Sequence, residues 1–196
     1  MNICLYGAAS DNIPKEYIEI VEELGALMAK RGHGLVYGGG SGGLMGAAAR
    51  GVRKGNGEVI GIAPSFFDVD GILFEDCTEL IYTETMRERK ALMEQKADAF
   101  VAVPGGIGTF DELFEIMSLR QLGRHTKPIA IFNANGYFDD IKNMLEKSIN
   151  QGFVSGECRK IAPFLEDAEK LVDYLEQAAK ETEHQDFSRF GAGFSK

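Results

Sequence analysis

The amino-acid sequence predicts an α/β fold with a doubly wound, mainly parallel sheet and helices on both of its faces. Short apolar runs alternate along the chain with longer segments whose apolar residues recur at helical spacing. The short runs are apolar throughout, which is typical of parallel strands buried on both faces. The chain has 196 residues, of which 44% are hydrophobic, and this suffices for one core of ordinary size. We therefore expect a single domain over residues 1–180.

In the first half of the chain, four apolar runs that end in a turn or lead into a helix predict strands at residues 2–7, 35–37, 59–62 and 79–82. Two helices are expected, at residues 14–31 and 44–53. The first has its apolar residues at helical spacing and stops at Gly32 and Gly34. The second is rich in alanine and follows a cluster of glycines.

The second half repeats the alternation, with apolar runs that predict strands at residues 99–103 and 129–132. Amphipathic segments predict helices at residues 87–97, 110–122, 138–151 and 165–179. A Thr85-x-x-Glu88 pattern precedes the first of these helices and fits a capping box. Residues 181–196 are polar and contain glycine and scattered phenylalanines, and we expect a loose tail there.

Charge and cysteine content exclude several classes of protein. Lys and Arg number 21 and Asp and Glu 30, and this net charge of −9 opposes general binding to nucleic acid. No apolar run reaches the roughly 18 residues of a membrane helix, and the N-terminus does not resemble an export signal. Cys4, Cys77 and Cys158 lie far apart, so we expect neither disulfides nor a thiolate zinc site. These features indicate a cytoplasmic protein that does not associate with membranes.

The first glycine cluster matches G-x-G-x-x-G at Gly38, Gly40 and Gly43, between a strand and a helix. Free backbone amides and the helix dipole at such a place favour a phosphate group. A dinucleotide fold, however, has this motif after its first strand and an acid at the end of the next one, and neither holds here. The other interpretation is a tight turn in which Gly42, Gly43 and Gly46 allow close packing of helix and strand. Both remain open.

The second cluster lies in the sequence VAVPGGIGTFDE, residues 101–112, at the carboxyl end of a predicted strand, where open parallel sheets bind ligands. Thr109 and Glu112 fit a capping box, which explains these two residues without any ligand. It does not explain Gly105, Gly106 and Gly108. Glycine amides that hold a phosphate, with a carboxylate one helical turn later, suit a substrate that carries an anion and develops a positive centre.

Two basic residues are expected on the covered side of the helix at 87–97. Arg89 and Lys90 fall within the stripe that Met86 and Met93 mark at helical spacing. Cations near the start of a helix face an unfavourable dipole of roughly 0.3 to 1 kcal/mol each, which an anionic ligand would reverse. The alternative is that Lys90 pairs with Glu94 on a solvated face.

The chain contains three motifs, GGGSGGLMG at residues 38–46, MRERK at 86–90 and PGGIGTFDE at 104–112. Together they closely resemble those of the Lonely Guy family, the cytokinin riboside 5′-monophosphate phosphoribohydrolases formerly described as possible lysine decarboxylases. The resemblance spans about residues 2–161. It implies a modified Rossmann sheet, a homodimer, and hydrolysis of the N-glycosidic bond of a nucleoside 5′-monophosphate. It implies neither a cofactor nor a metal.

The same resemblance assigns site residues. The catalytic pair falls on Arg89 and Glu112. Substrate-binding positions fall on Ser10, Gly40, Ser41, Met86, Lys90, Gly105, Gly106, Ile107, Gly108, Thr109 and Asp111. As the glycosidic bond breaks, an ionised Glu112 can stabilise the positive ribose and orient or deprotonate water, while Arg89 positions Glu112 and the ribose hydroxyls. Lys90 and the glycine loop would anchor the phosphate.

Two other functions compete with this one. A pyridoxal-phosphate decarboxylase would need a Schiff-base lysine, for which Lys90 is the candidate near the motifs. A non-catalytic nucleotide or cofactor carrier of related fold would need neither Arg89 nor Glu112, so their joint presence favours the enzyme.

The helix at 110–122 has more apolar surface than one buried stripe needs, which predicts a homodimer. The residues concerned are Phe110, Leu113, Phe114, Ile116, Met117, Leu119 and Leu122. The alternative is a central helix that its own chain covers on all sides.

Overall fold

The computed structural model describes residues 1–67 and 71–183. Within these residues, seven strands form one sheet in the order β4-β3-β2-β1-β5-β6-β7, and every neighbouring pair is parallel. The strands are β1 (Asn2–Tyr6), β2 (Gly34–Tyr37), β3 (Val59–Pro64), β4 (Glu79–Thr83), β5 (Ala99–Ala102), β6 (Ile129–Phe132) and β7 (Phe164–Leu165). The α/β, doubly wound architecture is therefore confirmed.

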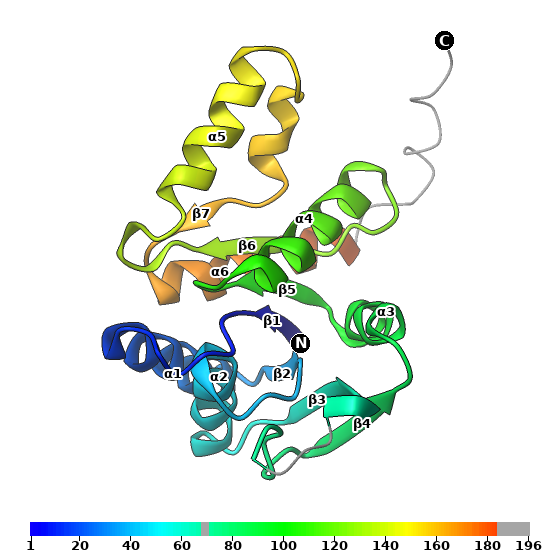
Figure 1. Ribbon diagram of the computed structural model, residues 1–196. Coiled ribbons are helices and arrows are strands. Elements are labelled where there is room, and N and C mark those ends of the chain that lie inside the picture. The colour runs from blue at the N-terminus through cyan, green and yellow to red at the C-terminus, as the bar shows by residue number, and fades with distance from the viewer. Residues whose placement is uncertain (68–70, 184–196) are drawn as a thin grey trace.

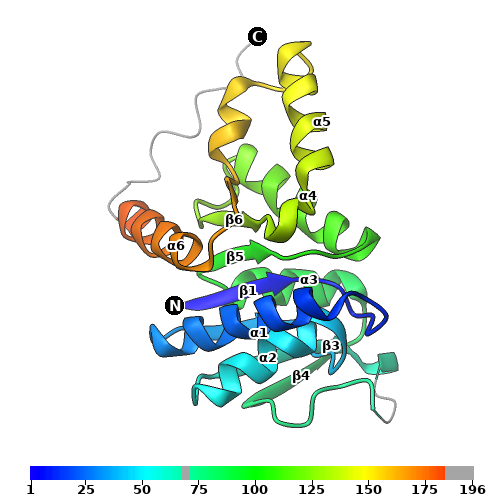
Figure 2. The same cartoon turned by 90° about the vertical axis from the view of Figure 1, so that its left-hand side faces the viewer.

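Six α-helices connect or follow these strands in the described part of the chain. They are α1 (Lys15–Lys30), α2 (Gly43–Lys54), α3 (Met86–Lys96), α4 (Ile107–Gln121), α5 (Asp139–Asn150) and α6 (Ala168–Glu183). Helices α1, α2 and α6 pack on one face of the sheet, and α3 and α4 pack on the other (Figures 1 and 2). The sheet thus separates two hydrophobic cores.

The alternation of side chains along β1 shows how one strand serves both cores. Ile3 and Leu5 pack against α1, α2 and α6, whereas Cys4 and Tyr6 pack on the side of α3 and α4. All four are at most 5% exposed. Because each face of β1 contacts a hydrophobic core, the sequence of the strand is apolar without interruption.

The chain reverses its direction of travel across the sheet at β1. From β1 it proceeds outward through β2, β3 and β4, and then returns to place β5 on the other side of β1. The loops that follow β1 and β5 therefore diverge, and this is where parallel sheets of this kind bind ligands. The amide of Ala8 donates a hydrogen bond to the carbonyl of Pro104 at 3.0 Å, which joins the two loops.

The structure differs from the expected elements near the C-terminus. A two-residue strand, β7, lies where the helix at 165–179 was expected to begin, and α6 starts at Ala168 and continues to Glu183. Residues 181–183, expected in the loose tail, thus form the last turn of α6, and the rest of that tail lies outside the described residues. Helix α5 was expected to cover the sheet, and its Ile141, Leu145 and Ile149 do pack against the core on the side of α3 and α4. It has no buried residue, however, and much of it projects from the body of the molecule (Figures 1 and 2).

In the part of the chain that the structure describes, no helix combines the length and apolar character needed to span a bilayer. Cys4, Cys77 and Cys158 are all free thiols.

Candidate functional site

The N-terminus of α4 carries the second glycine cluster. The helix begins at Ile107 with Gly106 as its N-cap residue, so Thr109 lies inside the first turn and is only 4% exposed. The capping box expected for Thr109 and Glu112 is therefore wrong, because the glycines allow the helix to begin earlier. Gly106 and Gly108 are exposed, and within the described residues their amides and that of Ile107 donate no hydrogen bond. These amides are available to an anion.

Glu112 does not cap α4, and its side chain points toward α3 instead. Arg89 Nη1 donates a hydrogen bond to Glu112 Oε1 at 2.8 Å, and the two side chains are only 6% and 11% exposed, respectively. Burial raises the pKa of Glu112 above its ordinary value, and the Arg89 guanidinium lowers it in part. The nearby Asp111 carboxylate raises the same pKa and Lys90 lowers it. The result is a desolvated carboxylate held in one orientation by a buried cation.

The start of α3 fixes the position of Arg89. The capping box expected there is present: Thr85 Oγ1 accepts a hydrogen bond from the Glu88 amide, and Glu88 Oε2 accepts one from the Thr85 amide, both at 3.2 Å. Arg89 then lies in the first turn, where its Nε donates to the carbonyl of Ile62 in β3 at 3.1 Å. Among the described residues no hydrogen bond uses Arg89 Nη2, which leaves that group as a donor for a ligand.

Lys90 links α3 to α4 rather than pairing within its own helix. Its Nζ lies 3.0 Å from Asp111 Oδ2 and 2.5 Å from Glu115 Oε2. The expected alternative, a pair with Glu94, is not what the structure shows. Hydrogen bonds to these carboxylates raise the pKa of Lys90, and Glu115 has the larger effect. Met86 was expected on the covered stripe but is 40% exposed.

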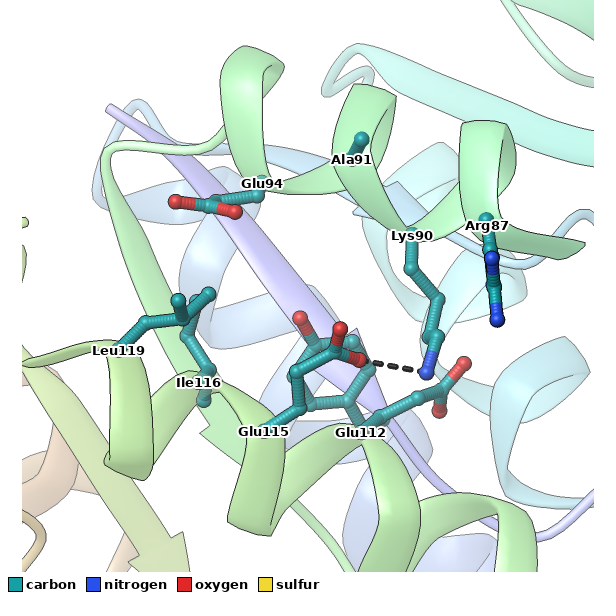
Figure 3. Close-up of a pocket in the computed structure, with 9 residues that line it drawn as sticks. Arg87, Lys90, Ala91, Glu94, Glu112, Glu115, Ile116 and Leu119 are labelled. Carbon is teal, nitrogen blue, oxygen red and sulfur yellow. Dashed lines mark ion pairs between the residues drawn. The ribbon is translucent and has the colours of Figure 1, made fainter. Parts of the chain in front are cut away.

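A cavity of about 290 Å³ opens between α3 and α4 beside Glu112 (Figure 3). Its lining consists of Tyr6, Arg87, Lys90, Ala91, Glu94, Glu112, Glu115, Ile116 and Leu119. Figure 3 shows Lys90 from α3 and Glu115 from α4 pointing toward one another across it. The cavity combines two cations with three carboxylates and an apolar end at Ile116 and Leu119.

Sequence reasoning missed Tyr6 as a lining residue of this cavity. Tyr6 is the last residue of β1 and stacks on Phe100 with ring centroids 6.2 Å apart. Burial raises its pKa, so its hydroxyl stays protonated. Strict alternation along β1, counted from Cys4, would have placed Tyr6 on the α3 and α4 side.

The first glycine cluster is used for packing. The amide of Gly43 donates to Asp11 Oδ1 at 2.7 Å, and the amides of Leu44 and Met45 donate to the carbonyl of Ala8 at 2.8 and 3.2 Å. A Cβ on Gly46 would lie 1.8 Å from the carbonyl oxygen of Ser41. The chain thus occupies the N-terminus of α2 itself, which favours the tight-turn interpretation. Asp11 was also missed, because nothing in its sequence neighbourhood indicates which helix it caps.

Three of the expected binding residues, Ser10, Gly40 and Ser41, have partners of their own in the loops. Ser41 Oγ donates to the carbonyls of Gly71 and Ile72 at 2.8 and 3.1 Å and so anchors the segment before β4. Gly40 forms a β-bridge with Leu73. Ser10 is exposed, and its Oγ accepts a hydrogen bond from the Asn12 amide at 3.1 Å. No hydrogen bond or ion pair between described residues joins Ser10, Gly40 or Ser41 to the pair.

Metal-binding side chains are not gathered in this region. Residues 1–67 and 71–183 contain no group of three or more His, Cys, Asp or Glu side chains that could hold a metal ion. His33 pairs with Glu176 of α6 at 2.8 Å, and His125 bonds the carbonyl of Ile116 at 3.0 Å.

Comparison with known proteins identifies similar sequences over nearly the whole chain. The family model described as "Possible lysine decarboxylase" matches residues 45–175. Cytokinin riboside 5′-monophosphate phosphoribohydrolase LOG2 of Arabidopsis thaliana is 38% identical over 185 residues, which cover 94% of this chain and 86% of that protein. Cytokinin riboside 5′-monophosphate phosphoribohydrolase LOG of Oryza sativa subsp. japonica is 37% identical over 181 residues, covering 92% and 75%.

Solved structures are similar in fold. The molybdenum cofactor carrier protein of Chlamydomonas reinhardtii superposes with a TM-score of 0.71 at 19% identity, over 91% of this chain and 98% of that one. The structure of a protein named TM1055 gives a TM-score of 0.69 at 25% identity, over 90% and 98% of the two chains.

Proposed function

Because the chain belongs to the family of cytokinin riboside 5′-monophosphate phosphoribohydrolases, we propose that it hydrolyses the N-glycosidic bond of a purine nucleoside 5′-monophosphate. The substrate is AMP or an N6-substituted AMP, and the products are the free base and ribose 5-phosphate. The observation that carries this proposal is the buried pair of Arg89 and Glu112, 2.8 Å apart, beside the open amides of α4. A phosphate on those amides places the sugar near the carboxylate.

Glu112 is the catalytic carboxylate in this proposal. When the bond between C1′ and the base breaks, the ribose gains positive charge, and an ionised carboxylate in a dry site stabilises that charge strongly. The same carboxylate orients water and accepts its proton as the water oxygen bonds to C1′, which a raised pKa favours. The departing base takes up one proton, so that the two halves of water end on the ribose and on the base. Arg89 keeps Glu112 ionised and in place through its Nη1. Its Nη2 remains for the ribose hydroxyls.

The phosphate anchor is the loop from Gly105 to Thr109. Gly106, Ile107 and Gly108 expose their backbone at the positive end of a 15-residue helix. Lys90 adds a positive charge near this end but is already shared by Asp111 and Glu115. We therefore assign the amides the larger part of phosphate binding, with Lys90 holding α3 and α4 together.

Decarboxylation of lysine, which the description of the family model names, is not favoured by these residues. Lys90, the candidate for a Schiff base with pyridoxal phosphate, is held in ion pairs with Asp111 and Glu115. The carrier proteins of similar structure share only 19 to 21% of the sequence and therefore bear on the fold alone.

The decisive experiment compares a nucleotide with its nucleoside. Purified protein incubated with AMP, N6-isopentenyl-AMP and adenosine should release base from the two monophosphates and far less from adenosine, because adenosine cannot use the α4 amides. Chromatography of the free base together with an assay for ribose 5-phosphate measures both products. Equal rates on adenosine and AMP would contradict the phosphate anchor.

A further inference from the structure

Gly38, the first residue after β2, lies directly against the guanidinium of Arg89. A Cβ built on Gly38 would be 2.1 Å from Arg89 Nη2 and 3.2 Å from Arg89 Cζ. Gly39 has a φ of +78°, but Gly38 does not have a positive φ. The backbone of Gly38 is therefore accessible to any residue, and what excludes a side chain at this position is Arg89.

The guanidinium cannot yield to an added methyl group without losing its contacts. Arg89 is 5% exposed and is held by the Ile62 carbonyl through Nε and by Glu112 through Nη1. Non-bonded atoms need about 3.5 Å, so a methyl group at 2.1 Å would displace the guanidinium by more than 1 Å. A shift of that size breaks one or both hydrogen bonds.

The other glycines of this cluster have different neighbours. A Cβ on Gly43 would meet the backbone of the loop after β1, and one on Gly46 would meet the backbone of Ser41. These positions serve the packing of α2. Gly38 is the member of the cluster whose added Cβ would collide with a side chain of the proposed catalytic pair.

We infer that Gly38 is a positioning residue. Because it has no side chain, the Arg89 guanidinium can lie against its backbone in the position from which Nη1 reaches Glu112. We call this contact the seat of Arg89. This inference rests on the proposed function and extends it to a residue outside the helices that carry the pair. It also gives the first glycine cluster a role in the site without any contact to phosphate.

The variant Gly38→Ala tests the seat through kinetics. It should remain folded, because the displaced atoms are the end of a flexible side chain, while kcat for AMP falls by about 100-fold. KM should rise much less than kcat falls, because the phosphate binds at α4 and the guanidinium contributes only the contact with the ribose hydroxyls. The acid limb of the kcat profile should move to higher pH, because Glu112 loses the cation that lowers its pKa.

Gly57→Ala provides a matched control. Gly57 lies between α2 and β3, its φ is not positive, and its added Cβ would crowd Val52 Cγ1 at 2.6 Å and Ala29 Cβ at 3.0 Å rather than Arg89 or the residues that hold it. It should lower the melting temperature but leave kcat and the pH profile of the folded enzyme unchanged. If Gly38→Ala keeps full kcat, or if Gly57→Ala loses as much, the inference is overturned.

A double-variant cycle on melting temperature keeps the seat testable whatever the substrate. Gly38→Ala should lower Tm in the unchanged protein and have little effect in the Arg89→Ala background, where the guanidinium is gone. Additive effects of the two substitutions would overturn the inference. Absence of base release by the unchanged protein would instead count against the proposed function, while this cycle would still decide whether Gly38 seats Arg89.

Discussion

Two opposing influences act on the carboxylate of Glu112. Its burial favours the neutral acid, while Arg89, donating from 2.8 Å, favours the ion. From the sequence, Arg89 could be placed on a covered helix face and Glu112 one turn after a glycine loop. Their contact could not be predicted from spacing, because it depends on α3 and α4 packing side by side on the same face of the sheet.

The variant Glu112→Gln removes the negative charge of this side chain but keeps its shape. Gln can still accept the hydrogen bond from Arg89 Nη1, so the protein should fold with a similar melting temperature. Without the negative charge, release of adenine from AMP should fall by about two orders of magnitude or more, while AMP still binds. Single-turnover release of adenine and a thermal melt measure the two effects. Glu146→Gln, which removes an ion pair with Arg159 away from the site, serves as the control and should keep full activity. A fully active Glu112→Gln protein would refute the mechanism.

The pH dependence of activity should differ from that of stability. The groups that face Glu112 are Arg89 and Lys90 from α3, Asp111 from its own helix, and Cys4 and Tyr6 from β1. Its folded pKa lies above the ordinary carboxyl value, so kcat should fall as pH decreases through that raised pKa.

Protonating Glu112 does not weaken the fold, because a group whose pKa is raised by folding adds stability as pH falls through that value. Glu22 and Glu176 behave in the opposite way. Lys54 and Arg31 donate hydrogen bonds to them and lower their pKa, so the stability that these pairs add is lost as pH falls from the ordinary carboxyl pKa through the lowered one. Parallel profiles of kcat and Tm from pH 4 to pH 8 should show activity lost first. Coincident loss of both would contradict the assignment of the acid limb to Glu112.

At the scale of elements, the same four-residue pattern gave one correct and one wrong prediction. Thr85-x-x-Glu88 forms a capping box, whereas Thr109-x-x-Glu112 does not. The difference is the three glycines before Thr109, which let the chain turn into the helix at Gly106. A pattern of hydrogen-bonding residues alone cannot show which of two possible first turns the backbone adopts.

Helices α2 and α4 both begin after a glycine cluster, but the N-terminus of α2 is capped by Asp11 and that of α4 is open. This difference predicts opposite effects for two variants. Asp11→Ala removes the carboxylate that caps α2 and should cost about 1 kcal/mol of stability without changing KM for AMP. Gly108→Asp adds a carboxylate to the first turn of α4, where a Cβ meets nothing within 4 Å. It should preserve or raise Tm but increase KM for AMP by about tenfold or more through charge repulsion. An unchanged KM in Gly108→Asp would place the phosphate elsewhere.

For the whole molecule, uninterrupted apolar runs were sufficient to predict six of the seven strands found in the described residues. β7 was missed because two residues, Phe164 and Leu165, are too few to show any period. The projection of α5 was not predictable either, since an amphipathic helix has the same sequence pattern whether it lies flat on a sheet or leans on a neighbouring segment.

We propose that the protein is a homodimer in which α4 contributes to the interface. Its own chain buries Leu113, Ile116 and Met117, but Phe114 is only half-buried and Leu122 is 55% exposed. Light scattering at low micromolar concentration should give about twice the chain mass of 21.4 kDa.

The variant Leu122→Asp should shift the protein toward the single-chain mass. Phe153→Asp, which changes a residue that is 82% exposed beyond the end of α5, should not. A single-chain mass for the unchanged protein would contradict the dimer.

The central place of β1 has a consequence for how the protein is synthesised. β1 leaves the ribosome before β5, with which it pairs on one side, and the amide of Asn2 at its start bonds Asp98, which is translated 96 residues later. Until then β1 is the edge of a growing sheet, with apolar side chains and backbone groups open to unwanted partners. Arg89 is likewise made before Glu112 and before the α4 surface that covers it. The nascent chain therefore carries Arg89 without its carboxylate partner, and the site is completed only when the strands on either side of β1 have both been made.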